Sequence, residues 1–113
     1  MASKFSFRLT STARNDLDDI VAYISLILSN PQAATNFLNK FQNAVNEVCC
    51  FVESGPIVDN EFLIGSNVRK KLVGNYIMYY LFNIEQKMIY VVRIVYSKRN
   101  IDDIIRNLDM QNL

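Results

Sequence analysis

Residues 68–96 read VRKKLVGNYIMYYLFNIEQKMIYVVRIVY and contain three runs of apolar, β-branched and aromatic side chains. Such runs are typical of β-strands, and their scarcity of polar residues predicts strands covered on much of both faces. Gly74 and Asn75 separate the first two runs, and this dipeptide favours a two-residue hairpin turn. The stretch therefore predicts an antiparallel meander. Its strands are residues 68–73, 76–84 and 88–96.

The residues before the meander predict one strand and two helices. Residues 5–9 alternate apolar and polar side chains, which is the period of a strand with one buried face. Thr10 and its neighbours offer N-cap oxygens, and Asp16 lies early enough in the next helix to favour its positive end. Apolar residues then recur at helical spacing in two stripes, each predicted to be buried. The stripes are Leu17, Ile20, Val21, Ile24, Ile27 and Leu28, and Ala34, Phe37, Leu38, Phe41, Ala44, Val45 and Val48.

The resulting order, β-α-α-β-β-β, describes an α+β fold. Asn30 and Pro31 end the first helix and begin the second, so the helices should fold back as an antiparallel pair. This hairpin is expected to pack on one face of a small, mostly antiparallel sheet. The length of 113 residues predicts a single domain, 1–113. Asn100 is a candidate cap for a short C-terminal helix with an apolar stripe of Ile101, Ile104, Ile105 and Leu108.

The composition closes several classes of chemistry. The chain has no histidine, which excludes a histidine general base and histidine-ligated zinc. Cys49 and Cys50 are adjacent, too close for an ordinary disulfide, and are interpreted as residues of a reduced cytosolic helix. We expect neither a metal nor a cofactor. The chain lacks an apolar run of membrane-spanning length and a signal-like N-terminus, so we expect a cytoplasmic protein without a membrane partner.

The net charge of +1 hides an uneven distribution along the chain. Residues 1–68 carry a balance of −3 and residues 69–113 a balance of +4. Such a division is compatible with a local anion-binding surface or with a chance scatter of solvated charges. The charge count alone favours neither interpretation.

The basic residues of the meander are the candidates for chemistry. Arg69 and Lys71 are two apart on a predicted strand, so their side chains should share a face, and Lys70 should point to the other. Arg99 follows the last strand, directly after Lys98. If the sheet brings these cations together, they form the array that a phosphate backbone needs. The alternative is that the basic residues of the first strand only protect a sheet edge from unwanted pairing.

Two tyrosines and one arginine are further candidates for nucleic-acid contacts. Tyr79 or Tyr96 could stack on a base or bond a phosphate if it is exposed near the cations. Arg93, on the last predicted strand, could add a phosphate contact. The simpler interpretation of the tyrosines is packing, with the hydroxyl reaching water.

Several stretches, in consistent order along nearly the whole chain, resemble the RelE/ParE superfamily of bacterial type II toxins. They are RLT at 8–10, ARNDL at 13–17, IVAYI at 20–24, NPQAA at 30–34 with Phe37, VRKKLVGNY at 68–76 and VRIVYSKRN at 92–100. The resemblance implies the same β-α-α-β-β-β fold. It also implies a growth-inhibiting toxin, neutralised by a cognate antitoxin protein that is encoded beside it.

Two target classes share this fold, and fold alone cannot choose between them. RelE-like members cut messenger RNA in the ribosomal A site with basic side chains and an aromatic hydroxyl, whereas ParE-like members inhibit DNA gyrase without acting as nucleases. The ribosome-dependent endoribonuclease is the leading hypothesis, with the ribosome and messenger RNA as partners. Gyrase inhibition is the alternative. A third hypothesis is a weakened toxin that acts mainly as an antitoxin-bound co-repressor, reaching operator DNA only through the antitoxin.

The resemblance assigns roles residue by residue. Arg69 and Lys71 match two basic strand positions of the RelE-like nucleases, and Arg99 matches the arginine after the last strand. Lys71 is then the candidate base, and the two arginines would stabilise charge on the phosphorane. The set is incomplete, because those nucleases carry an arginine at the position of Ile77 and a catalytic tyrosine near Ile105.

The resemblance also implies how the antitoxin would bind. A flexible segment of it should fold on the toxin and place carboxylates against the basic face. The C-terminal stripe of Ile101, Ile104, Ile105 and Leu108 could pack on the chain itself or move aside for this partner.

Overall fold

The computed structural model describes residues 4–58 and 67–98. Their elements follow the predicted order, β-α-α-β-β-β, with one π-helical turn inside the helical hairpin. The predicted C-terminal helix after Asn100 lies outside the described residues. The elements are β1 Ser6–Leu9, α1 Ser11–Ala22, the π-helical turn Tyr23–Ile27, α2 Pro31–Cys50, β2 Arg69–Val73, β3 Tyr76–Asn83 and β4 Met88–Tyr96.

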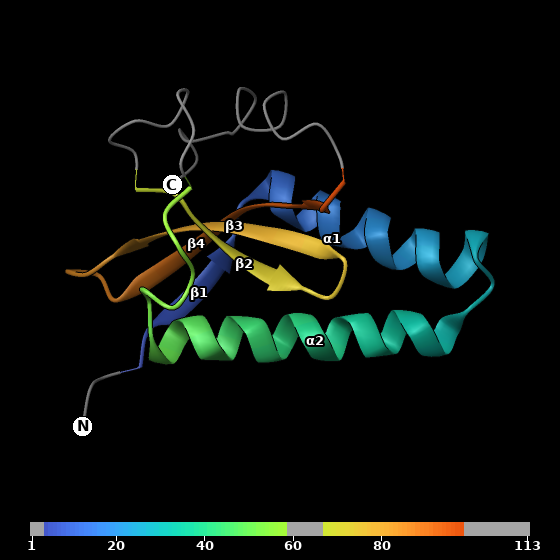
Figure 1. Cartoon of the computed structure of the whole chain (residues 1–113), viewed down its shortest axis with the longest axis horizontal. Coiled ribbons are helices and arrows are strands. Elements are labelled where there is room, and N and C mark those ends of the chain that lie inside the picture. Colours follow the sequence, from blue (N-terminus) through green and yellow to red (C-terminus); the bar gives the residue numbers. More distant parts are fainter. Residues whose placement is uncertain (1–3, 59–66, 99–113) are drawn as a thin grey trace.

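The four described strands form one mixed sheet in the order β1-β4-β3-β2. Strands β2, β3 and β4 form the predicted antiparallel meander, and β1 lies parallel to β4. The first turn of the meander begins with Gly74 at φ +60°, as in a type II′ hairpin turn. Helices α1 and α2 run antiparallel, and the tip of their hairpin projects past the end of the sheet (Figure 1).

Local residue chemistry fixes where each helix begins. Thr10 caps α1: its Oγ1 accepts a hydrogen bond from the Ala13 N–H at 3.2 Å and donates one to the Val92 carbonyl at 3.3 Å. The Asn30 side chain caps α2 by accepting from the Ala33 N–H at 3.0 Å, and Pro31 follows as predicted. The Thr10 cap therefore also ties the start of α1 to strand β4.

The π-helical turn changes which residues of the first stripe are buried. The Leu28 N–H donates to the Tyr23 carbonyl at 3.0 Å, five residues back, so the turn is one residue wider than an α-helical turn. Ile27 and Leu28 are 71% and 54% exposed, so their predicted burial was wrong. The wider turn shifts the helical register, and the tip extends beyond the sheet that would cover it. Leu38 on α2, 39% exposed, was also wrongly assigned to the core.

The sheet is packed on both faces, as the apolar strand sequences predicted. One buried cluster joins the two helices to the near face, with Phe37, Phe41 and Val45 of α2 against Met78 and Tyr80 of β3. A second cluster lies on the opposite face. It contains Val58, Val68, Ile77, Tyr79, Val92 and Val95. Among the described helices, none has the length and apolar character that a membrane span requires.

Candidate functional site

Arg69 begins the edge strand β2 and points to the helix-covered face. Its register partner is Tyr80, which belongs to the core under the helices. The Arg69 Nη1 donates to the Gly55 carbonyl at 2.7 Å and to the Glu53 carbonyl at 3.4 Å. Its guanidinium also lies over the Phe82 ring, 5.9 Å from the centroid. The side chain therefore holds the segment after α2 against the sheet.

Tyr80 of strand β3 also holds this segment through its hydroxyl group. The Tyr80 hydroxyl donates to the Val52 carbonyl at 2.9 Å and accepts from the Gly55 N–H at 3.1 Å. Gly55 itself is buried, and a Cβ at this position would lie 2.1 Å from the Lys70 carbonyl oxygen. Only glycine fits this close approach of two backbones. Arg69 thus belongs to a structural clamp around residues 52–55.

Lys71 shares the face of Arg69, as its spacing predicted, but the two do not line one cavity. Its Nζ lies 2.7 Å from the Glu47 Oε2 of helix α2. The cavity beside Arg69, about 610 Å³ in volume, is lined by Phe82, Glu85 and their neighbours and does not include Lys71 among its described lining. Arg99, the third predicted catalytic residue, lies outside the described residues.

Lys70 of β2 and Tyr79 of β3, two of the candidate nucleic-acid contacts, lie on the face of the sheet opposite the helices. Lys70 is half-buried and in register with Tyr79. Tyr79 is only 1% exposed, and burial raises the pKa of its hydroxyl. Its ring therefore has no free face for a base in this conformation. Lys98 is exposed just beyond β4. The antitoxin-binding candidates Ile101, Ile104, Ile105 and Leu108 lie outside the described residues.

Arg93 forms an ion pair with Asp16 of α1. Its Nε donates to Asp16 Oδ2 at 2.7 Å and its Nη2 to Oδ1 at 3.2 Å, and the two side chains are only 13% and 15% exposed. The Ile94 N–H donates to the same Oδ2 at 3.0 Å. Asp16 was expected to favour the positive end of α1, but it lies beyond the first turn of that helix. It instead accepts the Ile94 N–H where β4 extends past the end of β1.

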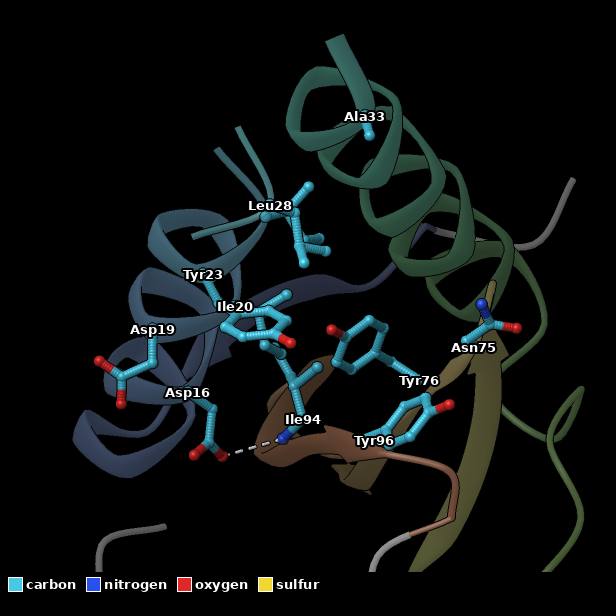
Figure 2. Close-up of a pocket in the computed structure, with 11 residues that line it drawn as sticks. Asp16, Asp19, Ile20, Tyr23, Leu28, Ala33, Asn75, Tyr76, Ile94 and Tyr96 are labelled. Carbon is cyan, nitrogen blue, oxygen red and sulfur yellow. Dashed lines mark hydrogen bonds between the residues drawn. The ribbon is translucent and has the colours of Figure 1, made fainter. Parts of the chain in front are cut away.

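An open groove lies beside this ion pair, between the helical hairpin and the ends of β3 and β4. Its volume is about 670 Å³. Figure 2 shows the rings of Tyr23, Tyr76 and Tyr96 gathered around it, with Asp16 and Asp19 on the helical side. The lining residues are Asp16, Asp19, Ile20, Tyr23, Ile24, Leu28, Ala33, Asn75, Tyr76, Ile94 and Tyr96.

Two tyrosines of the groove, Tyr76 and Tyr96, form an aromatic cluster with Phe37 of α2. Tyr76 packs edge-on against Phe37, with centroids 5.0 Å apart, and lies 5.7 Å from the Tyr96 ring. Burial, followed by the nearby hydroxyls of Tyr23 and Tyr96, raises the pKa of Tyr76. Tyr23 and Tyr96 are 49% and 45% exposed, so each presents ring surface to the solvent. The raised pKa of Tyr76 and the engaged Asp16 carboxylate suit the groove to binding rather than to acid–base catalysis.

The family profile described as "ParE toxin of type II toxin-antitoxin system, parDE" matches residues 7–101. The chain belongs to the ParE toxin family. No curated protein shows a significant sequence match to this toxin chain. Its fold is similar to that of several solved structures, among them two whose sequence identities are too low to indicate more than the fold.

Two of the similar structures come from different bacteria. The first is the toxin–antitoxin complex RelBE2 from Mycobacterium tuberculosis, with 19% identity and a TM-score of 0.60 over 83% of this chain and 99% of that chain. The second is the chromosomal ParDE system from P. aeruginosa, with 21% identity and a TM-score of 0.62 over 84% of this chain and 98% of that chain. The RelE/ParE-like α+β fold predicted from the sequence is confirmed.

Sequence reasoning did not find the groove of this ParE family member. Asp19 and Tyr23 lie one turn apart on the first helix, but Tyr76 begins strand β3, and only the fold brings the helix and the strand together here. The many tyrosines of the meander pointed to an aromatic binding surface, but the sequence favoured Tyr79 and Tyr96 as its members. Of these two, the structure places only Tyr96 at an open surface.

Proposed function

We propose that this type II toxin inhibits growth by binding DNA gyrase and does not cut RNA. The proposal is supported by the contacts of Arg69 and Lys71, the two described residues of the predicted catalytic set. Each already binds another group of the chain. Arg69 holds the Gly55 carbonyl, and Lys71 holds the Glu47 carboxylate. Both side chains therefore have structural partners in the free protein.

RNA cleavage requires a free base and free cations, and the residues described at 4–58 and 67–98 do not present them on strand β2. A general base must reach the ribose 2′-hydroxyl, and cations must be free to face the phosphorane. Lys71 is held on its carboxylate partner, and Ile77, where RelE-like nucleases carry an arginine, is apolar and 5% exposed. The buried Tyr79 supplies no hydroxyl to such a site. These observations support the non-catalytic ParE-like mode over the nuclease mode.

The ribosome-dependent endoribonuclease is the second candidate, and one observation favours it. Arg69 and Lys71 lie on one face of β2, and the Glu47 side chain that holds Lys71 is 62% exposed. An ion pair with so exposed a partner contributes about 1 kcal/mol or less. A phosphate of messenger RNA could therefore replace Glu47 as the partner of Lys71 in the ribosome.

We also propose that the chain acts in the cytoplasm and is neutralised by a cognate antitoxin. Two observations support this partner: the family profile describes toxins of toxin–antitoxin systems, and both similar structures belong to such systems. The product of a neighbouring reading frame that binds this chain and restores growth would identify the antitoxin. Harmless overexpression without that product would instead favour the weakened, co-repressor form of the toxin.

Growth inhibition by matched variants tests the proposed mode. Wild type, Lys71→Ala, Arg99→Ala and the control Glu47→Gln are induced separately, while plasmid supercoiling and transcript ends are followed. Gyrase binding predicts that Lys71→Ala and Arg99→Ala remain toxic and that supercoiling falls without codon-phased cleavage. Cleavage within translated codons that disappears in Lys71→Ala and Arg99→Ala, while Glu47→Gln retains it, would establish the nuclease instead.

A further inference from the structure

The groove described above has a chemical character that the basic candidates do not share. Its described lining combines three tyrosines, two aspartates and apolar side chains, and includes neither lysine nor arginine. Carboxylates and open aromatic faces around an apolar floor favour an organic cation with an apolar stem. Arginine fits best among side chains, because its planar guanidinium stacks on rings and bonds carboxylates with two parallel N–H groups.

The two aspartates of the groove differ in what they can offer. Asp16 already accepts three hydrogen bonds, from the Arg93 guanidinium and the Ile94 N–H. Asp19 follows one turn later on α1 and is exposed, and no ion pair among the described residues engages it. The described side of the groove therefore carries one uncompensated negative charge. Lys40 of helix α2 places its side chain beside Gly74 in the β2–β3 turn and does not line the groove.

Apolar residues beside the groove indicate that the cation belongs to a protein. Leu26, Ile27 and Leu28, at the hairpin tip, are 73%, 71% and 54% exposed, and Leu28 also lines the groove. A contiguous exposed apolar surface is typical of an interaction site, and π-helical turns occur often at functional sites. A free small cation would leave this surface uncovered, whereas a peptide with apolar residues beside its arginine would cover it.

We propose that this groove binds an arginine side chain of the antitoxin, flanked by apolar residues that pack on the hairpin tip. The inference rests on the proposed antitoxin partner and assigns part of its recognition to a surface distinct from strand β2. The guanidinium stacks against the half-exposed rings of Tyr23 and Tyr96 and pairs with Asp19. The aliphatic stem lies along the apolar floor of the groove.

A titration with a model compound tests the groove without the antitoxin. N-acetyl-arginine amide is added to the full chain, and the ring resonances of Tyr23 and Tyr96 are followed by NMR. The neutral isostere N-acetyl-citrulline amide is the matched ligand control. Saturable shifts are expected with arginine. Binding should be about tenfold weaker for citrulline and for Asp19→Asn, which corresponds to the loss of one ion pair of moderate strength.

Asp18→Asn is the matched protein control, because Asp18 is an exposed neighbour on α1 outside the groove lining. This variant should bind N-acetyl-arginine amide like the wild type. Equal shifts with citrulline, shifts that map away from the groove, or equal losses in Asp18→Asn and Asp19→Asn would overturn the inference. None of these outcomes bears on whether the chain inhibits gyrase.

The second arm uses the product of the neighbouring reading frame. Its affinity is measured for wild type, Asp18→Asn and Asp19→Asn, and each of its arginines is replaced by glutamine in turn. One arginine should show a coupling with Asp19 of about tenfold in a double-mutant cycle. Tight binding without any such coupling overturns the groove assignment and leaves the antitoxin proposal intact. Absence of binding to the wild-type chain overturns the antitoxin proposal itself.

Discussion

The ion pair between Asp16 and Arg93 should be a main support of the contact between helix α1 and strand β4. The Asp16 carboxylate accepts three hydrogen bonds, and both side chains are less than one-sixth exposed at 15% and 13%. Removal of one partner of a buried ion pair costs about 3–5 kcal/mol, because the other charge is left without a partner. The lower end applies here, since both groups retain some contact with water. We therefore expect Asp16→Ala to lower the free energy of unfolding by about 3 kcal/mol.

The size of the chain converts this loss into a measurable shift. For a domain of about 100 residues, 1 kcal/mol changes the melting temperature by about 4–6 °C, so Asp16→Ala should melt about 12–18 °C lower. Asp16→Asn keeps an oxygen for the Ile94 N–H and should lose about 2 kcal/mol. Asp18→Ala, an exposed change on the same helix, should stay within about 0.5 kcal/mol of wild type. Calorimetry or urea unfolding that places Asp16→Ala within about 1 kcal/mol of Asp18→Ala would show that the ion pair does not support the contact between α1 and β4.

Three further predictions concern the clamp and the buried titratable groups. Gly55→Ala should lower the free energy of unfolding by about 2 kcal/mol or more in urea unfolding, because its Cβ would meet the Lys70 carbonyl oxygen. Iodoacetamide should label the exposed Cys50 in the folded chain and reach Cys49 only on unfolding, as mass spectrometry of tryptic peptides would report. Burial raises the pKa of Cys49 above 9.0 and that of Tyr79 above 10.0, so the unfolded state loses these protons first. Stability should therefore be full below about pH 9 and fall as the pH rises further, and a melting temperature that is constant from pH 8 to pH 11 would contradict this.

The sequence predicted best those features that depend on a few neighbouring residues. Asn30 caps helix α2, Pro31 begins it, and Gly74 begins the hairpin turn, as predicted. A cap oxygen, a fixed φ and a tolerated positive φ are properties of single residues. The π-helical turn was missed, since its i→i+5 hydrogen bond leaves no mark in the spacing of the apolar residues. As a result, Ile27 and Leu28 were predicted to be buried, whereas both are exposed.

The partners of the charged side chains could not be predicted, because they are distant in sequence. The spacing of Arg69 and Lys71 correctly placed them on one face, but not against the Gly55 carbonyl and Glu47. Asp16 and Arg93 are 77 residues apart and meet only where β4 extends beyond the end of β1. Strand register and helix position decide such pairs, and neither is encoded in local patterns.

Supercoiling by purified DNA gyrase, assayed with the purified chain, distinguishes gyrase inhibition from RNA cleavage. A gyrase inhibitor should reduce supercoiling in a dose-dependent way as wild type and as Lys71→Ala alike, and should leave messenger RNA intact when the same preparations are added to translating ribosomes. Normal supercoiling at high toxin concentration, together with cleavage of ribosome-bound messenger RNA that Lys71→Ala abolishes, would contradict it.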